Sequence, residues 1–255
     1  MKTKTLILII AFMPLYLVNI YSQELVGGYS LGHGNFLMSD SREILAEQLE
    51  ILQQDFSKMK TTDSYPSGLF HNAYIGMMSS MNEFGLKYDR YTTGGRNHLK
   101  DKTGEIYMKE LLKGDAIGLY YKFHFISLPV SKDVRFSANV GLSTGLILNK
   151  IDYTGELTLN EPLPTYLEND TINRKGSSVN WYIQPTAGIQ FWFKNRICLH
   201  INAGYEFDVQ GKVRTPYQYV DYYTAAQGRE HDYGIDWSGL RVSAGIGFAF
   251  SAFKK

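Results

Sequence analysis

The chain contains long segments in which apolar and polar residues alternate with a period of two. The pattern is clearest in residues 197–209 and 240–250, and it recurs in residues 136–146 and 179–193. Successive side chains of a β-strand point to opposite faces, so this alternation predicts strands with one apolar and one polar face. Segments of this length exceed the usual strand length in soluble proteins, about 5–6 residues.

Four less regular segments bring the number of predicted strands to eight: residues 25–37, 68–78, 84–89 and 117–125. Short connections are expected near Ser80–Glu83, Pro129–Asp133 and Lys194–Asn195. Long connections are expected at residues 38–66, 92–116, 149–178 and 211–236. An even number of strands, with short turns on one side and long loops on the other, is typical of a bacterial transmembrane barrel.

The polar faces of these strands consist mainly of Gly, Ser, Asn and Gln, with few Lys and Glu. Such small side chains suit the crowded interior of a narrow barrel. Trp181 and Trp237 on the long-loop side, and Trp192 and Phe193 on the short-turn side, are expected at the two membrane interfaces. The sequence therefore predicts an all-β fold: an eight-stranded antiparallel transmembrane up-and-down β-barrel with short periplasmic turns and long extracellular loops.

The N-terminal segment differs from the rest of the chain. Lys2 and Lys4 precede an apolar run at residues 6–20, and Ser22 offers a small residue before a cut near Gln23. These features predict a cleaved signal peptide at residues 1–22, although a membrane anchor is the alternative. Residues 23–255 then form the barrel domain, and a signal peptide with a closed barrel indicates the cell outer membrane of a Gram-negative bacterium.

Composition excludes several other classes of protein. A single Cys cannot form an internal disulfide framework, and the formal net charge of +1 gives no general attraction to nucleic acid. The sequence indicates no cofactor and no metal site. The expected partners are outer-membrane lipid and, at the extracellular loops, a protein.

One stretch resembles a known family. Phe123–Leu148 is similar to a block of the PorT-like outer-membrane β-barrel family, carried by Pro129, Phe136, Gly141 and Gly145. Residues 245–250 resemble the last strand of that family, although this chain ends in two lysines rather than an aromatic residue and has Ser-Leu before Pro129. The resemblance implies the fold and the membrane location, permits a part in a secretion apparatus, and implies no catalytic residues.

The first long connection contains a predicted amphipathic helix at residues 40–60. Its apolar stripe has steps of three and four residues: Leu45, Leu49, Leu52, Phe56 and Met59. The stripe packs on the barrel mouth or its loops in one interpretation, and docks a partner in the other.

The polar faces carry the candidate lumen residues. The predicted polar network comprises Lys122, Arg135, His200, Glu206, Asp208 and Arg241, with Lys87, Asp89 and His124 on the same faces. Because buried charges must be paired, Arg135 and Arg241 are expected to neutralise Glu206 and Asp208. Cys198 beside His200 is expected to fill space rather than act as a nucleophile.

The last long connection is rich in tyrosine. Its candidate recognition residues are Tyr217, Tyr219, Tyr222, Tyr223, Arg229 and Tyr233. Tyrosine buries area and keeps a polar tip, so these side chains suit recognition of sugars or proteins, or simply extend the barrel.

The sequence thus favours a non-enzymatic outer-membrane barrel that is structural or docks a partner through its extracellular loops, in association with a secretion apparatus if the PorT-like resemblance extends to function. One alternative is an outer-membrane enzyme, a lipid or peptide hydrolase using a His and a Glu at the lumen rim or in a loop, such as His200, Glu206 or His231. The other is a secreted soluble β-barrel for a small apolar ligand, which requires the apolar faces to point inward.

Overall fold

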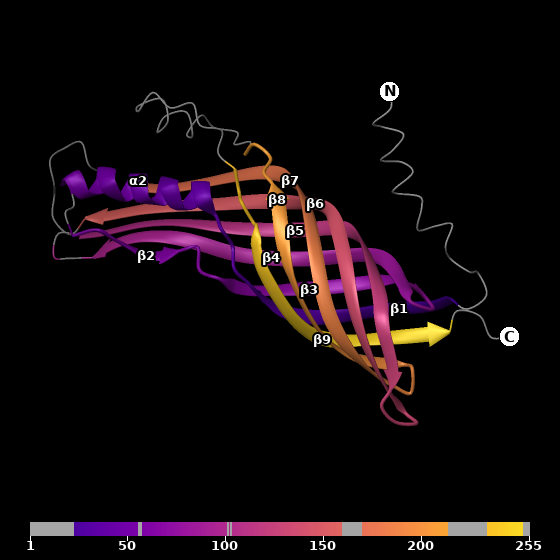
Figure 1. Cartoon of the computed structure of the whole chain (residues 1–255). Coiled ribbons are helices and arrows are strands. Elements are labelled where there is room, and N and C mark those ends of the chain that lie inside the picture. Colours follow the sequence, from indigo (N-terminus) through magenta and orange to yellow (C-terminus); the bar gives the residue numbers. More distant parts are fainter. Residues whose placement is uncertain are drawn as a thin grey trace, which may run out of the picture.

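The computed structural model describes residues 23–55, 58–100, 102, 104–159, 170–213 and 234–251. It contains one helix and nine strands within these ranges (Figure 1). The elements are β1 (Gln23–Gly34), α2 (Ser39–Asp55), β2 (Lys60–Ser64), β3 (Gly68–Ser79), β4 (Asn82–Lys100), β5 (Gly104–Pro129), β6 (Val134–Leu159), β7 (Asp170–Phe193), β8 (Ile197–Val209) and β9 (Gly239–Ser251). The predicted signal peptide, residues 1–22, lies outside the described residues.

Eight of the strands close into a barrel. The strands pair antiparallel in the order β4-β3-β1-β9-β8-β7-β6-β5, and β5 pairs back to β4. The first strand β1 also pairs with the last, β9, so no edge remains in this ring. The predicted eight-stranded antiparallel barrel is confirmed, and β2 is an additional strand attached to the upper part of β4.

The apolar faces of the barrel point outward. Leu199 and Ile201 on β8 are 46% and 51% exposed, and Ile246 and Phe248 on β9 are 47% and 45% exposed. A closed barrel satisfies every backbone group internally, so an apolar exterior of this kind faces lipid. The soluble-barrel alternative is therefore wrong, because it requires these side chains in a core.

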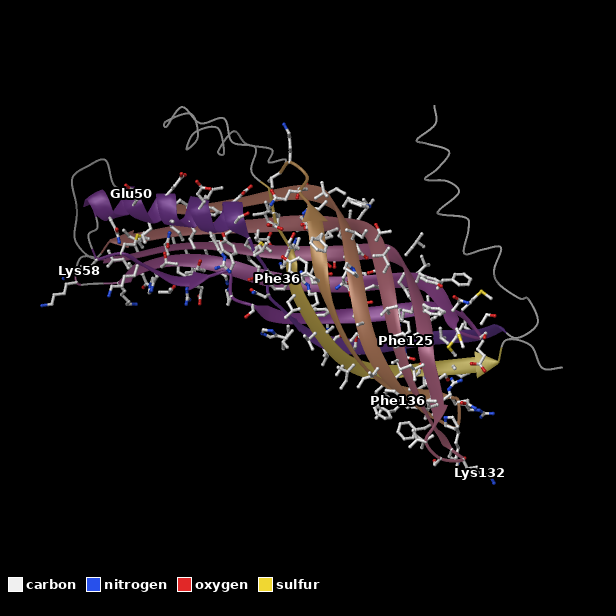
Figure 2. The ribbon with its side chains drawn as sticks, in the orientation of Figure 1. Phe36, Glu50, Lys58, Phe125, Lys132 and Phe136 are labelled. Carbon is white, nitrogen blue, oxygen red and sulfur yellow. The ribbon has the colours of Figure 1, made fainter. Side chains whose placement is uncertain are left out.

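Bacterial outer-membrane barrels have short periplasmic turns and longer extracellular loops, and the two ends of this barrel are named accordingly. Phe125 and Phe136 lie near the turn at Lys132, whereas Glu50 lies at the opposite end of the molecule (Figure 2). In the short β7–β8 connection Lys194 and Asn195 both have positive φ, 50° and 55°. This is the backbone of a tight hairpin turn that matches the twist of its strands. None of the described helices is long and apolar enough to cross a membrane.

Two of the predicted long loops are largely strands. β4 and β5 continue as a paired hairpin up to Lys100 and Glu105, and β6 pairs with β7 as far as Leu157 and Asp170. The prediction of loops at residues 92–116 and 149–178 is therefore wrong. Together with β2, these strands form an extracellular sheet that projects from the barrel, and α2 lies along it (Figure 1).

The polarity of the alternation inverts where the strands leave the membrane. On β6, Leu148 still points outward and is 43% exposed, while Ile147 is fully buried on the inner face. Two residues beyond Leu148, the outward-pointing residue is the exposed Lys150, and its neighbour Ile151 is buried on the inner face. Above the membrane the outer face meets water and therefore carries polar side chains. The inner face packs against α2 and therefore carries apolar side chains.

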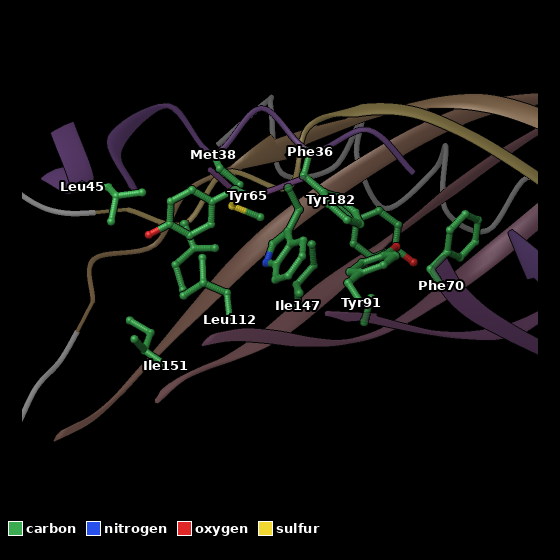
Figure 3. Close-up of a cluster of buried hydrophobic side chains, with 13 residues drawn as sticks. Phe36, Met38, Leu45, Tyr65, Phe70, Tyr91, Leu112, Ile147, Ile151 and Tyr182 are labelled. Carbon is green, nitrogen blue, oxygen red and sulfur yellow. The ribbon is translucent and has the colours of Figure 1, made fainter. Parts of the chain in front are cut away.

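The apolar stripe of α2 packs against the inner face of the extracellular sheet. Leu45 is buried in a cluster that fills the barrel mouth (Figure 3). Leu49 packs against a second cluster formed by Met59, Leu99 and Ile106. The helix ends at Asp55 rather than at Lys60. The packing interpretation of this stripe is confirmed for Leu45 and Leu49, which leaves neither free to dock a partner.

The predicted aromatic girdles are only partly present. Trp181 and Phe193 are 46% and 39% exposed on the outer face, as expected. Trp237 is fully buried and Trp192 is 3% exposed, so the prediction that these two lie at the membrane interfaces is wrong. Both point inward, and each helps to fill one end of the barrel.

Candidate functional site

A buried ion-pair network fills the periplasmic half of the lumen. Glu83, 1% exposed, accepts a hydrogen bond from Lys122 at 3.0 Å and contacts His124 Nε2 at 3.1 Å. The other ring nitrogen of His124 lies 3.0 Å from Ser137 Oγ. Glu83 was assigned to a turn and missed as a lumen residue. Its odd-numbered position continues the polar face of Gly85, Lys87 and Asp89 on the same strand, and this alternation could have revealed it. In the structure it is the cross-strand partner of Lys122.

Aromatic rings hold Lys122 in the centre of the barrel. The Lys122 ammonium lies 4.4 Å from the ring centre of Tyr74 and 4.9 Å from that of Tyr120. His200 meets the Tyr74 ring edge-on at 5.7 Å. A cation over two rings is stabilised where water is scarce. The Lys122 ammonium is therefore stabilised both by the Glu83 carboxylate and by the faces of two aromatic rings.

A second network fills the extracellular half. The Arg241 guanidinium donates to Glu206 at 3.2 Å, and the Tyr91 hydroxyl donates to the same carboxylate at 2.7 Å. Arg241 also lies over the rings of Phe36 and Tyr91, 4.6 and 5.1 Å from their centres. The predicted pairing of Arg241 with Glu206 is present, and both groups are buried.

The other predicted pair does not form. Asp208 accepts hydrogen bonds from Asn180 at 2.6 Å and from the backbone N–H of Trp237 at 3.0 Å. Arg135 instead lies over the Trp192 ring, 5.6 Å from its centre. Arg135 is the second residue of β6, at the periplasmic end, whereas Asp208 is the last but one of β8, at the extracellular end. The prediction that Arg135 neutralises Asp208 or Glu206 is therefore wrong. These residues share the inner face but lie at opposite ends of the barrel, as the short connection before Arg135 and the long connection after Asp208 already indicate.

An aromatic cluster closes the barrel mouth above the Arg241 network. Phe36 and Trp237 pack edge-to-face with ring centres 5.1 Å apart, and Tyr91 lies 5.3 Å from Trp237. The Trp237 indole N–H donates to Asn149 at 2.7 Å. These side chains are fully or almost fully buried. They are large enough to block an eight-stranded lumen, which is already filled by side chains.

A small cavity with a mixed polar and apolar lining lies between the two networks. Its volume is about 60 Å³, and its lining includes Tyr74, Lys87, Lys122, Gln184 and Arg241. Lys87 forms an ion pair with Asp89 at 2.8 Å and also donates to Gln184. The cavity has room for a few water molecules, not for a solute.

The residues of the hydrolase alternative do not converge. His200 forms no hydrogen bond through either ring nitrogen within the described part of the chain. Cys198 lies in an apolar cluster with Trp192 and Val26, which fits its expected role as a filler. Glu206 lies six residues along β8 from His200, about 20 Å at 3.3 Å per residue, and is already held by Arg241 and Tyr91. A general acid–base pair requires direct or water-bridged contact.

The tyrosine-rich segment, residues 217–233, which includes all six predicted recognition residues and His231, lies outside the described residues. Among the residues that the structure does describe, no group of three or more His, Cys, Asp or Glu side chains is placed to hold a metal ion.

Comparison with solved structures finds bacterial outer-membrane β-barrels. OprG from Pseudomonas aeruginosa is 12% identical, with a TM-score of 0.38 over 91% of this chain and 97% of its own. Neisserial surface protein A is 12% identical, with a TM-score of 0.36 over 89% and 97% of the two chains. Ail of Yersinia pestis is 11% identical, with a TM-score of 0.30 over 90% and 99%.

No family model matches the chain, and no curated protein matches it. The PorT-like resemblance therefore stays a prediction. At these identities and TM-scores, the function of none of the three solved proteins transfers to this chain.

Proposed function

We propose that this protein is a non-enzymatic, non-conducting outer-membrane barrel that docks a protein partner through its extracellular layer, formed by α2 and the sheet β2-β4-β5-β6-β7. One observation carries the proposal. Strands β4 to β7 continue well beyond the closed barrel as paired strands, covered by a helix, while the lumen beneath them is filled. A barrel that served only to conduct or to anchor would not need this rigid layer.

The exposed side of α2 is the proposed docking surface. Its apolar side is already used, since Leu45 packs into the barrel mouth. The exposed side carries Glu43, Glu50 and Gln53. Charged side chains at an interface mainly steer and select the partner. The proposed partner therefore presents a basic surface to α2.

The PorT-like resemblance supports a component of a secretion apparatus as this partner. Substitution of a photo-crosslinking amino acid at Glu50 or Gln53 in living cells tests the docking. Discrete protein adducts are expected from these two positions, and lipid adducts alone from the lipid-facing positions Leu199 and Ile201. The double variant Glu43→Lys/Glu50→Lys should lose the protein adduct formed at Gln53.

A charge change of the same kind on the periplasmic side, Asp133→Lys, is the matched control and should leave the adducts intact. The docking proposal is contradicted if neither α2 position gives a protein adduct in cells that contain correctly folded protein. The closed lumen is tested separately in planar bilayers, where purified protein is expected to give no single-channel steps.

A further inference from the structure

The lipid-facing surface contains a row of paired residues near its extracellular limit. This row runs across five strands through directly paired residues: Tyr88, Ile117, Leu146, Trp181 and Val209. All five side chains point outward and are exposed. Tyr and Trp favour the boundary between acyl chains and head groups, so Tyr88 and Trp181 mark the outer surface of the hydrocarbon layer. On β6 and β7 the apolar exterior continues one row further, to Leu148 and Val179, which are 43% and 53% exposed.

The outer face of the extracellular sheet carries a concentration of cations directly above that row. The next four rows of β4 to β7 contain six basic side chains, which we name the basic face: Arg90, Arg96, Lys109, Lys113, Lys150 and Lys175. The same rows contain two carboxylates, Asp115 and Asp152. The whole chain is almost neutral, with a formal charge of +1, so the positive charge is concentrated by the fold.

Several of these cations face one another. Lys113 and Lys150 are directly opposite on β5 and β6. Arg96 and Lys109 are directly opposite on β4 and β5, although Arg96 also forms an ion pair with Asp63 of β2 at 2.9 Å. Like charges in such pairs destabilise a sheet. Neither Lys109 nor Lys150 forms an ion pair with any described residue.

The two nearby carboxylates are already engaged. Asp152 binds Lys113 at 2.8 Å, and Asp115 accepts a hydrogen bond from the Tyr88 hydroxyl at 2.7 Å. One carboxylate, Asp152, thus serves Lys113 beside the neighbouring cations Lys150 and Lys175. An external anion bound beside Lys113 and Lys150 would supply further negative charge where the basic face has more cations than carboxylates.

We propose that the basic face binds the phosphate groups of a phosphorylated glycolipid in the outer leaflet. The Lys113–Lys150 row lies four residues above the Tyr88–Trp181 row, about 13 Å along the strand and about 10 Å along the membrane normal at a tilt of roughly 40°. Head groups extend about 5–8 Å beyond the hydrocarbon layer, and long lysine stems reach down toward them.

Continuity with the lipid-facing surface favours a lipid over a soluble polyanion. The basic face and the exposed residues Leu119 and Leu146 lie on the same side of the same strands. A lipid whose acyl chains cover Leu119 and Leu146 therefore places its head group against Lys113 and Lys150. A soluble polyanion gains only the electrostatic part of this contact. This inference does not depend on the docking role of α2, which covers the opposite face of the sheet.

The test uses the folded mature protein in nanodiscs of zwitterionic lipid that contain bisphosphorylated lipid A, with retention of the lipid A measured by native mass spectrometry. The variant Lys113→Gln/Lys150→Gln should bind it about fivefold more weakly for each lysine removed, as expected for basic residues near an anionic surface. The matched control, Lys132→Gln/Lys194→Gln, removes two lysines from the periplasmic turns and should bind like wild type. Dephosphorylated lipid A should bind wild type as weakly as bisphosphorylated lipid A binds the first variant.

Equal binding by the first variant and the control, both with the heat-modifiable mobility of a folded barrel, overturns the inference. Displacement of lipid A by millimolar inorganic phosphate, or by a soluble sulfated oligosaccharide at similar concentration, also overturns it, because either result identifies a site for free anions. If the double variant does not fold, the single variants Lys150→Gln and Lys109→Gln are each compared with Lys132→Gln under the same criteria.

Discussion

The hydroxyl of Tyr74 on β3 occupies the space in front of Gly247 on β9, although β1 lies between these two strands. Both residues pair with Gly28 of β1, from opposite sides. A Cβ atom at Gly247 would lie 2.6 Å from the Tyr74 hydroxyl oxygen, and its next neighbours would be 3.4 Å away or more. The ring of Tyr74 thus lies flat across two inward-facing glycines, which explains why the narrow lumen accommodates it.

Substitution of Gly247 by Ala is expected to lower the free energy of unfolding by about 1–3 kcal/mol, the usual effect of overpacking. Tyr74→Phe removes the overlapping oxygen, so the double variant should recover most of that loss. Urea unfolding in detergent micelles measures the four species as a double-mutant cycle. Additive effects of the two substitutions would show that Tyr74 and Gly247 are not coupled as described.

A second tyrosine lies across inward-facing glycines in the same way. This arrangement shows which part of the lumen the sequence could predict. Tyr182 lies across Gly145 and Gly118, its neighbours on the next two strands. The alternation correctly predicted that these glycines face inward. It could not predict which tyrosine covers which glycine, because that depends on the pairing register across strands.

The extracellular sheet was missed for a different physical reason. Strands were predicted from a single pattern, apolar outward and polar inward, and this pattern holds only while the exterior is lipid. On β5 the exposed residues Ile117 and Leu119 follow it, but Leu112 is buried and Lys113 points outward. When the apolar and polar faces exchange sides within one strand, the segment no longer fits the apolar-outward alternation, and it therefore resembles an irregular loop.

The buried ion pair of the upper network should matter far more than an exposed one. Glu206→Gln removes the charge that neutralises buried Arg241, and breaking such a pair typically costs about 3–5 kcal/mol. Asp152→Asn breaks the ion pair with Lys113, whose side chains are 37% and 36% exposed, and should cost about 0–1 kcal/mol. Urea unfolding of both variants beside wild type measures the difference. Losses of similar size would contradict the view that the Arg241 network supports the upper lumen.

The Lys113–Asp152 pair also predicts a weak pH dependence. The hydrogen bond from Lys113 holds the pKa of Asp152 below its ordinary value of 3.8. A carboxyl group with a lowered pKa in the folded state stabilises the fold above its ordinary pKa and loses this effect as the pH falls through the lowered value. Wild type and Asp152→Asn should therefore differ slightly at pH 7, and in thermal unfolding this difference should shrink as the pH falls below 3.8. A difference that grows on acidification would have the wrong sign.

The contact of α2 with the barrel mouth depends on Leu45. This side chain is 4% exposed, and truncation of a buried Leu to Ala typically costs about 2–5 kcal/mol. Because the eight barrel strands close without α2, the loss should loosen the helix rather than unfold the barrel. Limited proteolysis of intact cells should cut within α2 faster in Leu45→Ala, with the heat-modifiable mobility unchanged. Ala46→Ser, on the exposed side of the helix, is the control and should be cut at the wild-type rate.

The position of the hydrocarbon layer is tested most directly at Ile201. This side chain is 51% exposed on the outer face, and its cross-strand partners Ile189 and Ala244 face outward as well. An arginine here would face acyl chains, which costs about 2–4 kcal/mol near the bilayer midplane. Ile201→Arg should therefore reduce the folded, heat-modifiable form in outer-membrane fractions. Thr158→Arg, also exposed but far up the extracellular sheet, should accumulate normally, because its outer face meets water; equal accumulation of the two variants would mean that β8 does not face lipid at Ile201.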